Sequence, residues 1–375
     1  MNELQDKSSE VLVVKEHNLS NIDVQRYSRQ ILLQEFGVQG QEKLQATSLL
    51  IAGVGGLGCN VALYCAGAGI GRIGIVDGDL ISSDNLHRQV AYGEDYVSRP
   101  KAHSLRASIN RYLINDACML LKKPLVSGSV LRWDGHLSVY GYGQDCPCYR
   151  CLYPHPPSRD AVKTCSDDGV MGPVVGVIGC MQANEIIKIA ANVKCSLAGY
   201  LYIFDGLNIK TKTVKLRQRN VDCLVCGDNA SISNLEDCKE LYECSAKENC
   251  QLLEKDDRVG PLFCLDLIKK CPDKLLLMDV RPAHEFSIGH LPYAINIPMT
   301  VLYGCEPEDL FHKLNTDINE MKNKGVYVIC RRGNESQEAV IYLREKFADP
   351  MISFKDVDGG YENWFHTVDH DFPLY

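Results

Sequence analysis

The residues whose types and spacing suit chemistry begin with a glycine run. Gly53-x-Gly55-x-x-Gly58 follows a short apolar segment and opens a predicted helix. Glycines at these positions let the backbone turn tightly and approach phosphate oxygens, while the helix N-terminus offers free N–H groups to an anion. Asp77 ends the next predicted strand, where a carboxylate can hydrogen-bond a ribose. The pattern predicts a nucleotide site, although an NAD-linked oxidoreductase or a glycine-rich turn without a ligand fits these residues as well.

Four cysteines form a second group. Cys148-x-x-Cys151 and Cys223-x-x-Cys226 are two C-x-x-C pairs, whose four thiolates suit a tetrahedral structural zinc ion. The long separation between the pairs leaves a second interpretation open, in which all four are buried apolar side chains. The chain has 18 cysteines, and in a reducing compartment we do not expect them to form a disulfide framework.

A third group surrounds Cys330. This cysteine ends the predicted strand 326–330, and the loop CRRGNES (330–336) leads from it into a predicted helix. Backbone amides of the loop, the helix N-terminus and Arg331 or Arg332 would lower the pKa of the thiol. The same donors would stabilise an anionic persulfide. A phosphatase loop would carry Arg at the seventh position, where this chain has Ser336, so phosphate chemistry is disfavoured.

Composition narrows the class of protein. The formal net charge of −8 disfavours binding to a polyanion such as nucleic acid. The polar N-terminus, MNELQDKSSE, has no basic or apolar region typical of a signal peptide. We also expect no apolar run of the 18 or so residues that a membrane helix needs. These features predict a cytosolic protein.

The elements that must position these residues have an α/β pattern. We expect a mobile tail over 1–22, a doubly wound, Rossmann-like domain over 23–229, a polar linker over 230–257 and a second α/β domain over 258–375. In the first domain the predicted strands are 48–53, 72–77, 124–130, 136–142, 201–206 and 213–217, and the predicted helices are 56–69, 100–109, 111–123 and 173–193.

The motifs RYSRQ (26–30), GVGGLG, DGDLISSDNLHRQ (77–89) and RPKA resemble, in this order, the ThiF and MoeB family of ubiquitin-activating-type adenylyltransferases. The resemblance implies that ATP and Mg²⁺ are cofactors and that the paired cysteines hold zinc. It also implies that Arg29 reaches the site of a second subunit in a homodimer. The residues that it assigns to ATP binding are Gly53, Gly55, Gly56, Asp77, Asp84, Asn85, Leu86, His87, Arg88 and Lys101.

Two further segments carry family resemblances. TCSDDGVMGP (164–173) is similar to the crossover loop of the ThiF and MoeB family, which implies that Cys165 can link covalently to a carrier's C-terminus; an ordinary loop thiol is the other interpretation. The segments 279–298 and 356–364, together with the Cys330 loop, resemble the rhodanese family. That resemblance makes Cys330 catalytic with Arg331 and Arg332, and makes Asp279 and His290 structural.

The first domain departs from its family after residue 110. In the family, a strand, a helix and a second strand follow the helix of Lys101, and the second strand ends in an Asp-Asn motif whose Asp helps to hold magnesium. Here SLRASIN (104–110) runs directly into RYLINDACML (111–120), so roughly 40 residues are missing by average element lengths. Asp116 belongs to the second helix and is not expected to replace the missing Asp. We expect an unpaired strand flank and exposed apolar surface, caused by a skipped exon, a faulty gene model or natural variation.

Together the two domains resemble the adenylyltransferase–sulfurtransferases of molybdenum cofactor synthesis and tRNA wobble-uridine thiolation. The resemblance implies ATP-dependent adenylation of the terminal Gly-Gly of ubiquitin-like carriers, namely the molybdopterin synthase small subunit and the ubiquitin-related modifier. A cysteine desulfurase would load Cys330 with a persulfide, which would convert the adenylate to a thiocarboxylate. The alternatives are a sulfurtransferase whose first domain serves as a scaffold, and an NAD-linked oxidoreductase, which lacks any supporting catalytic motif.

Overall fold

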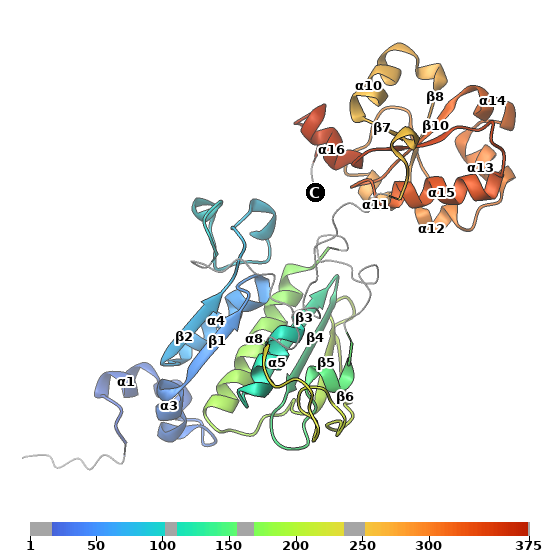
Figure 1. Cartoon of the computed structure of the whole chain (residues 1–375). Helices are drawn as coiled ribbons and strands as arrows, with labels where there is room; N and C mark the ends of the chain where they lie inside the picture. Colours follow the sequence, from blue (N-terminus) through green and yellow to red (C-terminus); the bar gives the residue numbers. More distant parts are fainter. Residues whose placement is uncertain (1–16, 102–110, 156–168, 236–251, 374–375) are drawn as a thin grey trace, which may run out of the picture. The chain divides into compact units, whose positions relative to one another are not determined.

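The computed structural model describes residues 17–101, 111–155, 169–235 and 252–373, and it divides into two compact units, Met1–Cys244 and Ser245–Tyr375. Figure 1 shows the elements of both units. The boundary between the units falls within the segment predicted as a linker. The second unit begins before residue 258, because the backbone N–H groups of Leu252 and Leu253 donate to Gln337 Oε1.

The N-terminal unit contains a parallel strand–helix–strand motif. β1 (Ser48–Ala52) pairs in parallel with β2 (Arg72–Val76), and α4 (Gly56–Ala68) connects them. These elements confirm the predicted strands and helix around the glycine run. The helices α1 (Asn21–Arg26), α2 (Ser28–Ile31) and α3 (Gly37–Ala46) precede this motif, and the one-turn helices η1 (Ser83–Asn85) and η2 (Glu94–Tyr96) follow it.

A second sheet in this unit is antiparallel, with the order β3-β4-β5-β6. Its strands are β3 (Leu125–Leu131), β4 (Asp134–Tyr140), β5 (Tyr200–Asp205) and β6 (Lys210–Lys215), at the positions that the sequence predicts. The accompanying helices are α5 (Arg111–Leu120), α6 (Tyr149–Leu152) and α8 (Gly172–Ala190). The helix predicted at 100–109 lies almost wholly outside the described residues.

Helix α8 connects the two sheets of the unit. Val174, Val175 and Ile178, near its start, pack with Val130 of the antiparallel sheet, and residues further along, including Ala183, pack with the core around β1. The helix has 19 residues and is long and apolar enough to cross a membrane by length and composition, so the expectation that no such run exists is wrong. Its packing against elements of both sheets accounts for its apolar sequence.

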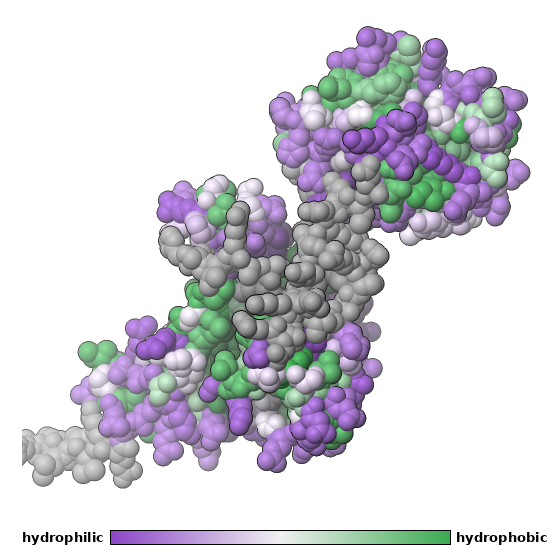
Figure 2. Space-filling model, viewed as in Figure 1, coloured by the Kyte–Doolittle hydropathy of each residue, from purple (hydrophilic) through white to green (hydrophobic). Residues whose placement is uncertain are grey.

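The N-terminal unit is thus built on two separate sheets rather than on one continuous sheet. Among the described residues, β1 pairs with β2 alone and β3 pairs with β4 alone, so β1 and β3 each have one unpaired edge. Leu50 of β1 is 68% exposed, and Leu63 and Tyr64 of α4 are more than half exposed. Figure 2 shows hydrophobic residues at the surface of this unit on the face in view. The expected unpaired flank and exposed apolar surface are confirmed.

The C-terminal unit has a parallel five-stranded sheet in the order β7-β11-β10-β8-β9. Its strands are β7 (Arg258–Val259), β8 (Leu275–Asp279), β9 (Ala294–Asn296), β10 (Gly325–Ile329) and β11 (Phe354–Val357). All five residues of β8 are buried, as expected for a central parallel strand covered on both faces. Its helices are α10 (Pro261–Lys270), α11 (Ala283–Phe286), α12 (Met299–Leu302), α13 (Pro307–Leu314), α14 (Ile318–Asn323), α15 (Glu335–Phe347) and α16 (Gly360–Thr367), with one-turn helices η5 (Lys255–Asp257) and η6 (Pro272–Lys274).

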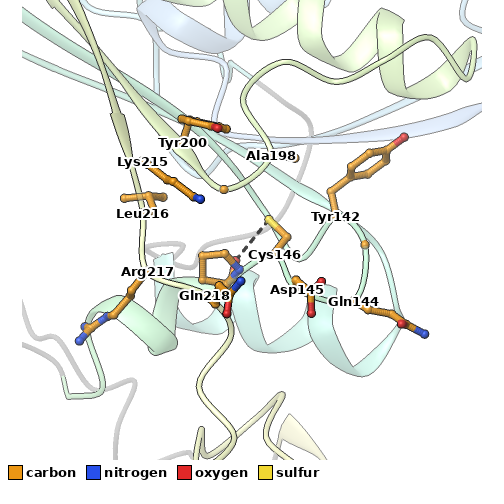
Figure 3. A pocket seen from close by; sticks show the side chains of 13 residues that line it. Tyr142, Gln144, Asp145, Cys146, Ala198, Tyr200, Lys215, Leu216, Arg217 and Gln218 are labelled. Carbon is orange, nitrogen blue, oxygen red and sulfur yellow. Dashed lines mark hydrogen bonds between the residues drawn. The ribbon is translucent and has the colours of Figure 1, made fainter.

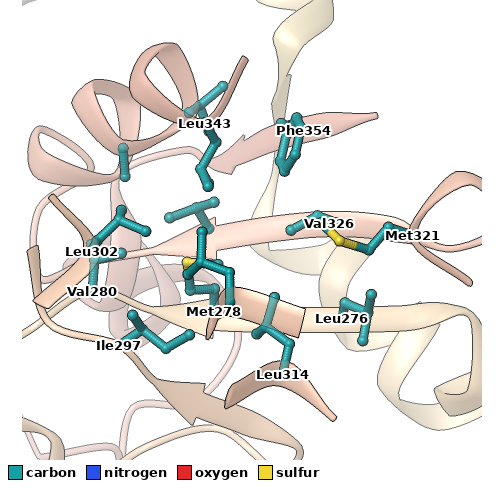
Figure 4. Close-up of a cluster of buried hydrophobic side chains, with 14 of the residues drawn as sticks. Leu276, Met278, Val280, Ile297, Leu302, Leu314, Met321, Val326, Leu343 and Phe354 are labelled. Atoms are coloured by element: carbon teal, nitrogen blue, oxygen red, sulfur yellow. The ribbon is translucent and has the colours of Figure 1, made fainter. Parts of the chain in front are cut away.

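Two hydrophobic clusters lie on the two faces of this sheet. Met278, Val326 and Leu343 belong to the larger cluster, which Figure 4 shows beside Leu302 and Phe354. Alternate residues of the same strands, such as Leu277, belong to the other cluster. The period-two alternation of strand side chains therefore supplies both cores, and the sheet holds the Cys330 loop at the end of a fully packed strand.

We expect the two units to respond differently to loss of a leucine side chain. Leu277→Ala, in a fully buried position, should lower the free energy of unfolding by about 2–5 kcal/mol. Leu50→Ala, at the exposed flank of β1, should change it by less than about 0.5 kcal/mol. Denaturant titration of the two variants measures both changes. A large cost for Leu50→Ala would mean that other protein covers this flank in solution.

Candidate functional site

Four cysteine sulfurs gather in the N-terminal unit. The Sγ atoms of Cys148, Cys151, Cys223 and Cys226 all lie within 4.8 Å of one another. Cys148 Sγ is 3.8 Å from that of Cys151 and 3.6 Å from that of Cys223, and Cys151 Sγ is 3.4 Å from that of Cys226. Four thiolates around a tetrahedral zinc, with Zn–S bonds of about 2.3 Å, would lie roughly 3.8 Å apart. The donor set and its spacing therefore fit a zinc ion.

A buried ion pair supports this cluster, and no motif in the sequence analysis pointed to it. Arg150, between the first two cysteines, donates from Nη2 to Asp116 Oδ2 over 2.7 Å, and both side chains are almost fully buried. Asn115 Oδ1 accepts from the backbone N–H of Tyr149 over 2.8 Å. Helix α5 thus holds the segment of the first cysteine pair in place. The Asp116 carboxylate pairs with Arg150, in agreement with the expectation that Asp116 does not replace the family's magnesium-holding Asp.

Cys146 lies outside the four-cysteine cluster. It lines a cavity of about 340 Å³, together with Tyr142, Tyr200 and Lys215. The Cys146 thiol donates to the carbonyl oxygen of Val139 over 3.3 Å and to that of Pro147 over 3.8 Å, and Figure 3 draws the second of these bonds. Burial raises the pKa of this thiol. Cys146 is therefore a protonated packing residue.

The glycine run forms the turn that the sequence predicts. Gly53 has φ of +88°, in the region that favours glycine. A Cβ on Gly58 would lie 1.9 Å from the carbonyl oxygen of Gly53, and a Cβ on Gly56 would lie 2.6 Å from Val175. Asp77 is buried and accepts hydrogen bonds from the backbone N–H groups of Val54 (2.7 Å) and Asp79 (2.9 Å). These two hydrogen bonds to the Asp77 carboxylate therefore stabilise the conformation of the glycine loop.

Cations lie beside this loop. Lys101 Nζ is 3.3 Å from Asp79 Oδ2. Arg88 donates to the carbonyl oxygen of Asp84 over 2.8 Å and to the side-chain oxygen of Asn85. Asp77 accepts two backbone hydrogen bonds and Asp79 pairs with Lys101, and we derive no step through Mg²⁺.

The other predicted ATP-site residues occupy varied positions. Asp84 and His87 are exposed and Leu86 is half-buried, all on the segment that carries Arg88. Arg29 is exposed on α2. Gly55 is the residue before the first turn of α4. Cys165 lies outside the described residues. The structure therefore places the glycine turn and the basic segment in one unit, with Arg29 on its exposed N-terminal helices.

In the C-terminal unit, Cys330 directly follows β10 and is buried. The backbone N–H of Gly333 donates to Cys330 Sγ over 3.1 Å, and Ser336 Oγ lies 3.1 Å from the same sulfur. Gly333 has φ of +76°, so glycine is required where the loop turns back over the sulfur. This arrangement matches the predicted loop of donors around Cys330.

The expected low pKa of this thiol is wrong. Burial raises the pKa of Cys330, and the hydrogen bond from Ser336 opposes this only in part. Desolvation disfavours the anion, and in this structure it outweighs the nearby donors. The resting sulfur is therefore a protonated thiol, and it needs a route for its proton before it can act as a nucleophile.

The segment 356–364 contacts the backbone of the Cys330 loop. The backbone N–H groups of Tyr361 and Glu362 donate to the carbonyl oxygens of Cys330 and Arg331, each over 3.0 Å. A Cβ on Gly360 would lie 2.2 Å from the Cys330 oxygen. Arg332 pairs with Glu362 over 3.2 Å at the partly exposed rim. Close backbone approach explains the paired glycines of this segment.

Asp279 is structural, as the rhodanese resemblance implies. Its Oδ2 accepts from Arg281 Nη2 over 2.7 Å and from the Tyr361 hydroxyl over 2.9 Å, and the guanidinium lies 3.8 Å from the centre of the Tyr361 ring. Phe286 and His290 stack at 3.9 Å. Two residues that the sequence analysis missed, Arg258 and Asp356, form a further ion pair of 2.7 Å beneath the Cys330 loop.

Known proteins match both units. The ThiF family model matches residues 27–112 and 109–225, and the rhodanese-like domain model matches residues 264–367. The adenylyltransferase and sulfurtransferase MOCS3 of Caenorhabditis briggsae is 45% identical over 399 residues, covering 95% of this chain and 98% of that protein. The MOCS3 of rice is 41% identical and covers 94% of this chain and 84% of that protein. A structure of E. coli MccB is 22% identical, with a TM-score of 0.48, covering 58% of this chain and 77% of that chain.

The comparisons also locate the missing segment. The alignment with the C. briggsae protein spans 399 residues, more than the 375 of this chain, so that relative has residues that this chain lacks. The two ThiF matches overlap over residues 109–112, at the start of α5. The interruption after residue 110 therefore coincides with the split between the two sheets.

Proposed function

Because this chain belongs to the family of adenylyltransferases and sulfurtransferases that join a ThiF domain to a rhodanese-like domain, we propose that it activates ubiquitin-like sulfur carriers and loads them with sulfur. Both classes of activity are those of the family. The observation that carries the proposal is Cys330, buried within a loop that donates hydrogen bonds to its sulfur. The carriers are proteins with a terminal Gly-Gly, of the molybdopterin synthase small-subunit and ubiquitin-related modifier types.

In the adenylation half-reaction, a carboxylate oxygen of the carrier attacks the α-phosphorus of ATP, and pyrophosphate leaves. We assign binding of the nucleotide to the glycine turn of Gly53, Gly55 and Gly56, with Asn85, Arg88 and Lys101 beside it. Cations near the phosphates neutralise the charge that develops during transfer. The product is an acyl-adenylate, whose carbonyl carbon is electrophilic.

In the sulfur half-reaction, a cysteine desulfurase persulfide transfers its outer sulfur to Cys330. The Cys330 persulfide then attacks the acyl-adenylate, AMP leaves and an acyl disulfide forms. A second thiol, for which Cys165 is our candidate, attacks Cys330 Sγ. The thiocarboxylate leaves, and the two cysteines become a disulfide that an external dithiol reduces. Arg331 and Arg332 contribute positive charge near the loop, which favours an anionic sulfur.

Three further features complete the proposal. The four-cysteine cluster holds a structural zinc ion, supported by its donor set and sulfur spacing. Exposed Arg29 on α2 is consistent with a role in a second subunit's site, and we propose a homodimer. The family of soluble enzymes to which the chain belongs supports a cytosolic location.

A second candidate function follows from the split sheet. β1 and β3 each have an unpaired edge among the described residues. The ThiF resemblance implies that a magnesium-holding Asp belongs to the segment missing at the interruption. A chain of this kind would be a working sulfurtransferase whose N-terminal unit binds partners but adenylates slowly. The carrier-dependent exchange experiment below separates this function from the full reaction.

We predict that Cys330→Ala abolishes sulfur transfer from thiosulfate to cyanide, because the sulfur that forms the persulfide is lost. Thiocyanate formation by the full chain measures the activity. Cys271→Ala, at the end of α10 and outside the loop, is the matched control and should keep wild-type turnover. Turnover by Cys330→Ala equal to that of the wild type would contradict the assignment.

Carrier-dependent ATP–pyrophosphate exchange by this chain should be at least about 100-fold slower than that of a full-length relative, the scale of losing one preorganised group that stabilises transition-state charge. Insertion after Asn110 of a relative's strand-helix-strand segment ending in Asp-Asn should restore exchange. A glycine-serine insertion of equal length is the control and should not. Exchange by the unaltered chain at the relative's rate would refute the prediction.

Purified protein should contain about one zinc ion per chain. Cys226→Ser should lose the metal because it removes one of the four thiolates. Cys146→Ser should keep it, since Cys146 lies outside the cluster. Elemental analysis of both variants and of the wild type measures the difference, and equal zinc in the two variants would argue against the four-cysteine site.

A further inference from the structure

A single side chain joins the start of the C-terminal unit to the Cys330 loop. Gln337 lies in the first turn of α15 and is fully buried. Its Oε1 accepts from the backbone N–H groups of Leu252 and Leu253 over 2.8 Å and 3.2 Å. Its Nε2 donates to the carbonyl oxygen of Gly333. One amide group therefore contacts both the segment that enters the unit and the loop that surrounds the sulfur.

These partners determine the orientation of the Gln337 amide. Two N–H donors meet one end of the amide and a carbonyl oxygen meets the other, so the oxygen must face the donors and the NH2 group must face the carbonyl. An aliphatic side chain of the same length would leave all three backbone groups without this partner, which is costly for buried polar groups. The arrangement therefore needs a side chain that carries both a donor and an acceptor.

The entry segment, residues 252–257, is docked on the rest of the unit. Leu253 is 6% exposed and belongs to the larger hydrophobic cluster. Asp257 pairs with Arg344 of α15 over 2.8 Å. The match to the rhodanese-like domain model begins at residue 264, so the entry segment lies outside it. The docking of this segment nevertheless reaches the Cys330 loop through Gln337.

Different partners hold the two halves of the Cys330 loop. The segment 356–364 donates to the carbonyl oxygens of Cys330 and Arg331. Further along the loop, Gln337 donates to the Gly333 carbonyl, and the Gly333 N–H donates to Cys330 Sγ over 3.1 Å. Glycine has wide conformational freedom, so a hydrogen bond to its carbonyl limits its movement. The contact with Gln337 therefore keeps the Gly333 N–H directed at the sulfur.

We propose that Gln337 is a positioning residue for sulfur transfer, which couples the entry segment to the Gly333 N–H that donates to Cys330. The docked entry segment holds the Gln337 amide, and the amide holds the Gly333 carbonyl. The Gly333 N–H then stabilises the sulfur whenever it is an anion, as a thiolate or as a persulfide. Sulfur chemistry at Cys330 therefore depends on residues that precede the rhodanese-like match.

The inference rests on the proposed persulfide role of Cys330, and its test does not require that role. The rate of iodoacetamide alkylation at Cys330 of the full chain is measured from about pH 6 to about pH 10, with the modified peptide quantified by mass spectrometry. Alkylation reports the thiolate fraction whether or not sulfur is transferred. Failure of the proposed function would instead appear as sulfur turnover by Cys330→Ala.

Gln337→Met keeps the length of the side chain and removes its donor and its strong acceptor. Alkylation at about pH 7.5 should fall about tenfold and the inflection should move to higher pH, because the thiolate loses a well-placed donor, on the scale of one hydrogen bond to a charged group. Glu335 and Asp356, whose charges raise the pKa of Cys330, stay unchanged. Hydrogen exchange at the amides of Leu252 and Leu253 should become faster.

Two residues of the larger hydrophobic cluster test the coupling and its specificity. Leu253→Ala loosens the entry segment but keeps the backbone N–H, so it should move the inflection in the same direction as Gln337→Met. Met321→Ala is the matched control. It truncates another buried residue of the cluster, on α14 before the start of β10, whereas Cys330 follows the end of that strand. It should leave the alkylation profile unchanged.

The double variant decides whether Gln337 is the connection. In the Gln337→Met background, Leu253→Ala should add no further shift, because the contact with the loop is already lost. Additive shifts would overturn the coupling, as would a Gln337→Met profile that overlays the wild type. An equal shift in Met321→Ala would indicate general loss of stability and would overturn it too. If Gln337→Met does not fold, Leu253→Ala against Met321→Ala decides: a shift in the first alone supports the inference, and any other result overturns it.

Discussion

Helix α8 holds the N-terminal unit together, because it packs against elements of both of its sheets. In one direction Val175 fills the space over Gly56, where any side chain on the glycine would collide with it. In the other direction Ile178 packs with Val130 of the antiparallel sheet. The glycine turn therefore keeps its shape through helix packing even though β1 has one unpaired edge. Loss of a central strand damages the sheet without removing the turn.

The chain uses two different environments for sulfur. In the four-cysteine cluster the thiols lie within 4.8 Å of one another, so a cation can replace their protons and hold all four as thiolates. Around Cys330 a single sulfur is buried, and desolvation keeps it protonated despite the nearby amide and hydroxyl donors. Spacing in the sequence predicts both sites, but burial decides the charge state of each sulfur. That burial is visible only after folding.

The sequence predicts local elements better than long-range pairing. The strands around Asp77 and Cys330 and the helix α15 follow from hydrophobic patterning and from glycine positions. The prediction of a low pKa for Cys330 was wrong, because the residues next to Cys330 in the sequence do not indicate how many side chains pack over its sulfur after folding. The ion pairs of Arg150 with Asp116 and of Arg258 with Asp356 join residues 34 and 98 positions apart. A single sequence contains no signal that links such distant partners.

The two units have separate cores, which determines how far the effects of the interruption reach. The clusters that support Cys330, with Leu277 on one face of the sheet and Met278 on the other, consist of residues of the C-terminal unit alone. A cooperative domain with its own core folds largely independently of its neighbours in the chain. The interruption after residue 110 lies in the N-terminal unit, so the Cys330 loop keeps the packing of its own unit.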